Sequence, residues 1–319
     1  SFLRPNFARA VADVIRAKGG KPFLTDCNTL YPGRRKNALE HLDAAAENGF
    51  SVASTGCQII IADGLKGLDE KIVPLTGTKH VKEAKIGHAI MDADIFVSLN
   101  HFKGHEATGF GGALKNIGMG CGSRAGKMEQ HCDGKPTVDR EMCRACRQCI
   151  KQCAHGAISY DEKKIASIDH ERCVGCGRCI AACNFDAIEN NGYNSELALS
   201  EKIAEYSLAV LQNRPNFHIN IVMQVSPNCD CHSENDVPII PDVGMFASFD
   251  PVALDQACAD ACNRMPVMAG SQLSENLEKC ESQHDHFTDT APNTNWTSTL
   301  IHAEELGLGT RKYELVTVK

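Results

Sequence analysis

Eight cysteines in one short stretch of the chain restrict its fold more than any other feature of the sequence. The first four, spaced C-x2-C-x2-C-x3-C, are Cys143, Cys146, Cys149 and Cys153. The same spacing returns thirty residues later at Cys173, Cys176, Cys179 and Cys183. Because the pair at 157–158, Ala-Ile, recurs at 187–188 with the same offset, the stretch is an internal duplication.

Cysteines at this spacing favour iron–sulfur clusters over other uses of the thiol. Each iron of a [4Fe–4S] cubane needs one thiolate, and the tight turns of C-x2-C-x2-C deliver three of them. The alternative is zinc, but four-cysteine zinc sites typically use two separated C-x2-C pairs. Two neighbouring clusters predict one-electron transfer, and the alternative is that both clusters only stabilise the fold.

The duplicated stretch resembles a bacterial two-[4Fe–4S] ferredoxin module, in which the fourth cysteine of each repeat binds the cluster of the other repeat. The resemblance implies that one cluster is bound by Cys143, Cys146, Cys149 and Cys183. It implies that the second is bound by Cys173, Cys176, Cys179 and Cys153. The proline that usually follows the fourth cysteine is replaced by Ala154 and Asn184, which removes no ligand. Such a module also implies a redox partner protein.

Composition narrows the class of protein further. An odd total of 17 cysteines in 319 residues argues against a small secreted disulfide scaffold and for a reducing compartment. We therefore expect a cytoplasmic protein, such as that of an anaerobe. A net charge of −7 argues against a nucleic-acid partner. The longest apolar runs, such as residues 59–62, are too short to cross a bilayer, so no membrane association is expected.

The rest of the chain predicts an α/β fold. Apolar residues at helical spacing alternate with short runs typical of strands. Helices are expected around residues 7–15, 38–46, 199–210, 251–263 and 296–305. Strands are expected around residues 22–25, 57–62, 95–99, 217–225 and 313–318. Residues 271–295 are polar and are expected to form a surface loop.

This alternation predicts a mainly parallel sheet with flanking helices. A small α+β two-[4Fe–4S] ferredoxin-like domain, residues 136–192, is expected to interrupt it. The α/β domain would then be discontinuous, made of residues 1–135 and 193–319.

A glycine-rich segment, residues 100–121, directly follows the strand predicted at 95–99. Ligands of open α/β sheets bind beyond the carboxyl ends of the strands. The backbone amides of Gly109, Gly111 and Gly112, with a helix starting near residue 113, suit an anion such as a phosphate or carboxylate. The segment does not fit the spacing of nucleotide-binding loops.

Titratable side chains complete this candidate pocket. We predict catalytic roles for four of them, with the histidines as proton donors: His101, His105, Lys103 and Lys115. We predict ligand binding by Gly109, Gly111, Gly112, Arg124 and Lys127. The alternative is that the histidines and lysines only orient the loop through hydrogen bonds to the backbone.

A second cysteine motif follows the strand predicted at 217–225. Cys229, Cys231 and His232 place two thiols and an imidazole within reach of one metal. Cys121, or Cys132 with His131, would complete the set if the two strand ends are neighbours. The motif predicts a third metal site or a redox dithiol, and the alternative is reduced thiols that only pack. Cys258 and Cys262 are predicted core residues.

Several long motifs resemble one family over nearly the whole chain. They are TDCNTLYPGR near the start, DGL at 63–65, FKGH, GFGGALKNIGMGC, SRAGK, DVGMFASFDPVALDQAC at 242–258, and LGLG near the C-terminal end. Together with the two cysteine repeats they are similar to the family catalogued as domain of unknown function 362. Compared with the family pattern, the chain begins one strand late. The resemblance implies an α/β core with two [4Fe–4S] clusters and names no substrate.

These patterns together predict an anaerobic oxidoreductase, or its electron-donating component, that passes electrons through two clusters to a small anionic ligand. Two alternatives stay open. One is a non-catalytic ferredoxin-like carrier that docks on a partner enzyme, and the other is a redox-sensing maturation factor. The sequence makes no prediction of oligomeric state.

Overall fold

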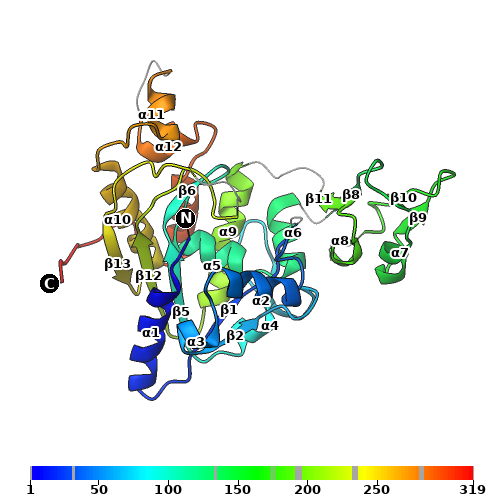
Figure 1. Ribbon diagram of the computed structural model, residues 1–319, viewed down its shortest axis with the longest axis horizontal. Coiled ribbons are helices and arrows are strands. Elements are labelled where there is room, and N and C mark those ends of the chain that lie inside the picture. The colour runs from blue at the N-terminus through cyan, green and yellow to red at the C-terminus, as the bar shows by residue number, and fades with distance from the viewer. Residues whose placement is uncertain are drawn as a thin grey trace.

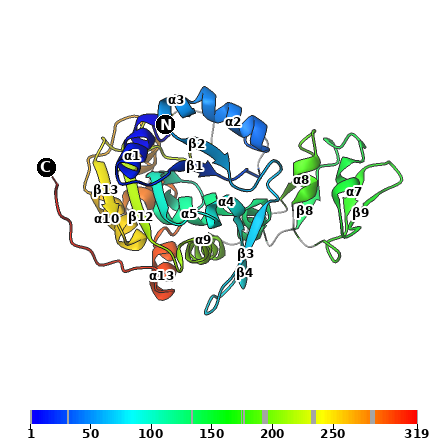
Figure 2. The ribbon, with the colours of Figure 1, turned by 90° about the horizontal axis from the view of Figure 1, so that it is seen from below.

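The computed structural model describes residues 2–30, 33–132, 135–173, 175, 177–190, 196–231, 236–279 and 284–318. Helices and strands are mixed throughout, which confirms the predicted α/β class. Figures 1 and 2 show a larger body with the cysteine-rich stretch beside it, on the right in both views. Within the described ranges, no helix combines the length and the apolar character needed to cross a bilayer.

The N-terminal elements form where the sequence predicts them. Helix α1 (Pro5–Ala17) begins at a proline, whose missing N–H is tolerated in the first helical turn. Helix α2 (Ala38–Glu47) is capped by the Asn37 side chain, which accepts hydrogen bonds from two first-turn N–H groups. Strand β1 (Phe23–Asp26) pairs in parallel with β2 (Gln58–Ile61).

A three-stranded sheet positions the candidate site. Strand β12 (Asn216–Val222) lies at its centre, parallel to β5 (Phe96–His101) and antiparallel to β13 (Gly244–Ser248). In this register His101 lies opposite Ile221. The strands β5 and β12 therefore end at the same edge of the sheet, so the loops that follow them are neighbours.

Helices α5 (Ala113–Cys121) and α10 (Pro251–Asn263) pack on this sheet. Helix α9 (Glu196–Leu211) packs on α5, and α6 (Arg124–Cys132) follows α5 in the chain. Helix α10 is capped as predicted, because the Asp250 side chain accepts from the N–H groups of the first helical turn. The shorter helices of the body are α3 (Val52–Thr55) and α4 (His88–Met91).

Hairpins make the described sheets less parallel than the sequence predicts. Strand β3 (Glu70–Pro74) pairs antiparallel with β4 (Glu83–Gly87), and β6 (Lys103–His105) pairs antiparallel with β7 (Gly109–Gly111). Among the described strands, β1–β2 and β5–β12 are the parallel pairs and the other five ladders are antiparallel. The three-stranded sheet is mixed because β13 runs antiparallel to β12, and part of the segment at 100–121 folds back on itself as the separate hairpin β6–β7.

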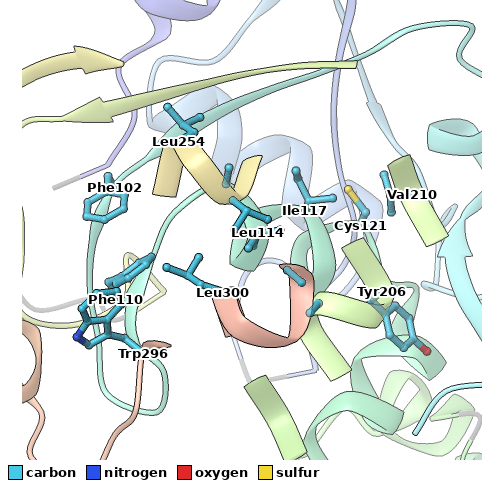
Figure 3. Packing of buried hydrophobic residues seen from close by; sticks show 14 of the residues in the cluster. Phe102, Phe110, Leu114, Ile117, Cys121, Tyr206, Val210, Leu254, Trp296 and Leu300 are labelled. Atoms are coloured by element: carbon cyan, nitrogen blue, oxygen red, sulfur yellow. The ribbon is translucent and has the colours of Figure 1, made fainter. Parts of the chain in front are cut away.

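The main hydrophobic core joins the glycine-rich hairpin to the helices. Figure 3 shows side chains of α5, α9 and α13 (Thr297–Glu305) gathered with Phe102 and Phe110. The two phenylalanine rings lie 4.8 Å apart, and the Trp296 ring lies 5.4 Å from Phe110. Burial of each phenylalanine contributes about 1.5–3 kcal/mol. The hairpin β6–β7 is therefore fixed to the core.

The prediction of a surface loop at residues 271–295 is wrong for the part of this segment that the structure describes. Helices α11 (Gln272–Leu277) and α12 (His286–Thr290) form there, capped by Ser271 and Asp285. Each helix buries one large apolar side chain completely; these are Leu273 and Phe287. Single apolar residues in a polar segment give little periodicity, which explains the error.

The last predicted strand, residues 313–318, is also wrong. These residues form no ladder, and residues 314–318 are exposed. Tyr313 instead donates a hydrogen bond to the Asp260 carboxylate on α10. Alternation of apolar and polar residues forms a strand only where a sheet edge accepts it.

The cysteine-rich stretch repeats its elements as well as its cysteines. Its first half contains β8 (Pro136–Val138), α7 (Gln148–Gln152) and β9 (Ile158–Tyr160). Its second half contains β10 (Ala166–Ile168), α8 (Arg178–Ala182) and β11 (Ile188–Asn190). Each element starts thirty residues after its counterpart, at 136 and 166, 148 and 178, and 158 and 188. Because β8 pairs with β11 and β9 with β10, both ladders join the two halves.

Candidate functional site

A hollow in the cysteine-rich stretch is lined by four thiols. They are Cys143, Cys146 and Cys149 from the first half and Cys183 from the second. The hollow measures about 320 Å³, including its open side, and Tyr160 and Phe185 also line it. These four cysteines are unpaired thiols and are the set predicted for one cluster. Their convergence therefore fits the donor set of a [4Fe–4S] cubane, with the fourth ligand from the other repeat.

The backbone between these cysteines adopts an uncommon conformation. Ala145 and Arg147 have φ of 53° and 66°, which side chains other than glycine rarely adopt. Their counterparts thirty residues later are Gly175 and Gly177, with φ of 71° and 66°. The same turns thus recur in both halves. In the first half the two positions are not glycine, so their backbone is strained, as is typical of functional sites.

The second predicted ligand set is only partly described. Cys153 and Cys173 are unpaired thiols, Cys179 is buried, and Cys176 lies outside the described residues. In the described part of the chain, no three His, Cys, Asp or Glu side chains are placed to hold a single metal ion. A cubane differs from a single ion because each of its four irons takes its own thiolate.

A second site lies where β5 and β12 end. The loop 226–231 is held against the glycine-rich hairpin, because Gly104 N–H donates to the Ser226 carbonyl at 2.8 Å. The Cys229 N–H donates to Glu106 Oε2 at 3.2 Å. His101 Nδ1 lies 2.7 Å from Asp230 Oδ2. The sequence-based hypothesis that the two strand ends are neighbours is therefore correct in this structure.

Four cationic or donor groups act on the sulfur of Cys229. Lys115 Nζ lies 3.6 Å from Cys229 Sγ. Hydrogen bonds from Cys231 and His105 and the charges of Lys115 and Lys103 hold the pKa of the Cys229 thiol far below its usual value, although burial opposes them. The bond to Cys229 and burial raise the pKa of the Cys231 thiol. The nearby Lys115 ammonium therefore favours a negative charge on Cys229.

His105 is the imidazole that faces this thiolate. Its Nδ1 accepts a hydrogen bond from Ala107 N–H, so Nε2 carries the proton of the neutral ring. Burial, and then the charge of Lys115, lowers the pKa of His105. His131 lies in the same charge environment, and burial first and the Lys115 charge second lower its pKa to about 3. His131 was considered with Cys132, but no side-chain contact of Cys132 is described.

The anion site predicted at the start of α5 is occupied by the protein itself. The Asp255 carboxylate accepts from Ala113 N–H at 2.7 Å and from Leu114 N–H at 2.9 Å. Asn220 Nδ2 donates to it at 2.8 Å. A side chain at Gly112 would overlap this carboxylate, which explains the glycine. The first amides of this helix therefore bind an internal carboxylate, and ligand binding by Gly109, Gly111 and Gly112 stays a prediction.

Two of the side chains predicted to bind the ligand, both cationic, donate hydrogen bonds to backbone carbonyls. Arg124 is fully buried and donates to the carbonyls of Thr29, Lys36 and Lys66. Lys127 Nζ donates to the Gly122 and Gly120 carbonyls at 2.6 and 3.1 Å, at the end of α5. Both side chains therefore hold the backbone in this structure, and ligand binding by Arg124 and Lys127 stays a prediction.

The other predicted residues divide between the site and the scaffold. Lys103 is buried within the pocket and approaches Gly111. His101 places Nε2 2.8 Å from the Met223 carbonyl and Nδ1 on Asp230, so it holds the loop. Cys121 lies near Cys27, not Cys229, because it ends α5 six residues, or about 9 Å, beyond Lys115. His232 lies outside the described residues.

The sequence-based predictions missed three carboxylates of this site. They are Glu106, Asp230 and Asp255. Asp255 lies within the motif DVGMFASFDPVALDQAC that carries the family resemblance, which was the available signal. Cys258 and Cys262 on the same helix are fully buried core residues, as predicted.

Replacing Gly104 with alanine should loosen the Cys229 loop. The new Cβ would overlap the Pro227 carbonyl, a backbone atom that cannot rotate away. We expect the free energy of unfolding to fall by about 1–3 kcal/mol, measured by urea unfolding under anaerobic conditions. Gly120→Ala is the matched control, because its Cβ would meet no atom within 4 Å. Equal stability of the two variants would contradict this packing.

The structure thus defines a mixed helix-and-strand protein with a duplicated cysteine-rich segment and a buried thiol pocket. A family model described as Domain of unknown function (DUF362) matches residues 1–260. The chain belongs to this family, as its motifs predicted. No curated protein and no solved structure matches the chain. Its function must therefore be argued from the two sites.

Proposed function

We propose that this protein is an iron–sulfur oxidoreductase, or the electron-donating component of one, with two [4Fe–4S] clusters. A ferredoxin-like domain of residues 136–192 would hold both, inserted between residues 1–135 and 193–319 of the α/β domain. The observation that carries the proposal is the hollow lined by Cys143, Cys146, Cys149 and Cys183. The repeat of elements extends it to Cys173, Cys176, Cys179 and Cys153. When bound, each cluster takes up or releases one electron at a time.

Helix α6 supports a functional link between the two sites. Met128 on this helix is fully buried in the same apolar cluster as Cys149, Cys179 and Cys183. His131 on the same helix shares the charge environment of the thiol pocket. Three residues of helix, about 4.5 Å along the axis, separate Met128 from His131. The helix is therefore a short physical connection between the cysteine-rich segment and the pocket.

The pocket supplies groups that suit a reduction. Buried Lys103 and Lys115 can stabilise negative charge that develops on a bound group, and His105 can hold a proton near it. Their neighbours in the structure are the Cys229 sulfur and the Asp255 carboxylate. A small anionic ligand remains part of the proposal, and it would meet Cys229 and Cys231 first.

A second candidate function is that of an electron carrier. Cys146, one of the four cysteines of the hollow, is exposed, so a partner protein can approach this site from solvent. That exposure favours a ferredoxin-like protein that docks on a redox partner. No separate observation favours a redox-sensing maturation factor.

The proposal is tested by metal analysis of protein purified under anaerobic conditions. We expect about eight irons and about eight acid-labile sulfides per chain, the sum of two cubanes. Zinc in place of iron, or iron without sulfide, would contradict the proposal. About twelve irons would keep it and add a third cluster, for which Cys229 and Cys231 are the remaining candidate ligands.

A further inference from the structure

Two cysteines of the pocket differ in access and in charge. Cys231 is exposed at the protein surface, whereas Cys229 is buried, with 9% of its surface accessible. A single residue, Asp230, separates the two cysteines in the loop, so the two thiols lie close together along the chain. Neither is part of a disulfide. An exposed thiol close in the chain to a buried thiol that faces a lysine ammonium suits thiol–disulfide exchange between the two cysteines.

The surroundings of Cys229 stabilise the thiolate without any metal. Lys115 Nζ lies 3.6 Å from its sulfur, and His105 donates a hydrogen bond to it. The backbone is fixed as well, because Cys229 N–H bonds to Glu106 and the adjacent Asp230 bonds to His101. Within the described ranges, the groups around Cys229 and Cys231 do not include three metal ligands placed on one ion. The lysine ammonium beside Cys229 favours the thiolate form, which is the nucleophile of thiol–disulfide exchange.

We propose that Cys229 and Cys231 form a redox-active dithiol that reduces a disulfide substrate. This inference names disulfides as the substrate class of the pocket. It rests on the proposed function, because the clusters would supply the electrons that return the dithiol to its reduced form. Exposed Cys231 is the entry residue, and buried Cys229 is the residue that resolves the mixed disulfide.

The exchange balances in atoms, protons and charge. Cys231 passes its proton to the Cys229 thiolate and attacks one sulfur of the substrate. A Cys231–substrate disulfide forms, the substrate S–S bond breaks, and the first thiol leaves with the proton from Cys229. The restored Cys229 thiolate then attacks Cys231 Sγ, forms the Cys229–Cys231 disulfide and expels the second substrate sulfur as a thiolate. The dithiol loses two electrons, and the substrate disulfide gains them.

The test uses 5,5′-dithiobis(2-nitrobenzoate), a disulfide whose released thiolate is coloured, on anaerobically purified full-length protein that retains its iron. We expect a fast release of two thiolates per chain with no bound nitrobenzoate on this loop, and a 229–231 disulfide by peptide mass spectrometry. Cys229→Ser should release one thiolate and keep one nitrobenzoate on Cys231. Release of thiolate with nitrobenzoate retained on Cys231 in the unsubstituted protein would overturn the proposal.

Two further variants separate the chemistry from the fold. Lys115→Met should slow the second release about tenfold, because the resolving sulfur loses its nearest cation. Lys18→Met, at the exposed end of α1, is the matched control and should leave both releases unchanged. Equal rates in the two lysine variants would contradict the assigned role of Lys115.

Iron and sulfide are measured on the same samples, so the dithiol proposal and the two-cluster proposal can be contradicted independently. Full iron and sulfide content without a 229–231 disulfide would overturn the dithiol alone. A fast 229–231 disulfide in protein without iron or sulfide would support the dithiol and contradict the two-cluster proposal.

Discussion

Replacing Cys183 with alanine should remove about half of the iron, about four of about eight atoms per chain, and leave the second cluster intact. Cys183 belongs to the second half of the duplication but lines the hollow with three cysteines of the first half. Loss of this thiolate leaves one iron of that cubane without a protein ligand. The measurement is iron and sulfide per chain, with electron paramagnetic resonance of the reduced protein.

Cys153→Ala is the matched variant of the other half. It should also remove about four irons, but from the cluster assigned to Cys173, Cys176 and Cys179. Combining Cys183→Ala with Cys143→Ala should cost no more iron than Cys183→Ala alone, because both act on one cluster. Combining Cys183→Ala with Cys153→Ala should remove nearly all of it. If the first pair removed all the iron instead, the crossed assignment of the fourth ligands would be wrong.

Replacing Asp255 with alanine should destabilise the α/β body by about 3–5 kcal/mol. The substitution leaves the N–H groups of Ala113 and Leu114 and the amide of Asn220 buried without their acceptor. It also removes the negative charge near buried Lys103. The measurement is the free energy of unfolding in urea, under anaerobic conditions.

Two controls define what the Asp255 carboxylate contributes. Asp255→Asn keeps the shape and one acceptor oxygen, so we expect a smaller loss of about 1–3 kcal/mol at neutral pH. Asp260→Ala, on the same helix but half-buried, should cost less than about 1 kcal/mol. A loss below about 0.5 kcal/mol for Asp255→Ala would show that this carboxylate does not hold the start of α5.

The comparison of wild type with Asp255→Asn should also depend on pH. Burial, opposed by its hydrogen bonds, raises the pKa of Asp255 to about 6, from 3.8. Because the pKa is raised on folding, the folded state binds this proton more tightly than the unfolded state does. The resulting contribution to the free energy of unfolding is complete below the unfolded pKa and is lost as the pH rises through about 6. The wild type should therefore gain stability relative to Asp255→Asn as the pH falls from about 7 to about 4.

The convergence of Cys143, Cys146, Cys149 and Cys183 on one hollow agrees with the set expected from the sequence. Short spacings bring three of these thiols into neighbouring turns, and the resemblance to a two-cluster ferredoxin module implies that the fourth comes from the other half. The strands β5 and β12 were also predicted, because each has its own apolar run, whereas their pairing entered only as a condition of the third metal site. That pairing is what brings Cys229 next to Lys115.

The sequence could not predict which positive charges face the pocket. Arg124 and Lys127 lie close to the glycine-rich segment along the chain, yet both bind backbone carbonyls. Their partners are set by how distant loops pack, which no local pattern reports. The anion at the start of α5 comes from Asp255, 142 residues beyond Ala113. A glycine-rich helix start therefore predicts that an anion binds there, but not whether the anion is a ligand or a side chain of the protein.

The central claim, that eight cysteines hold two one-electron centres, is tested most directly by a reductive titration. Anaerobically purified protein is titrated with dithionite and followed by visible absorbance and electron paramagnetic resonance. The account predicts that each chain takes up about two electrons and that the signals of two reduced [4Fe–4S] clusters appear. Uptake of no electrons by protein that retains its metal, or of one electron with a single cluster signal, would contradict it.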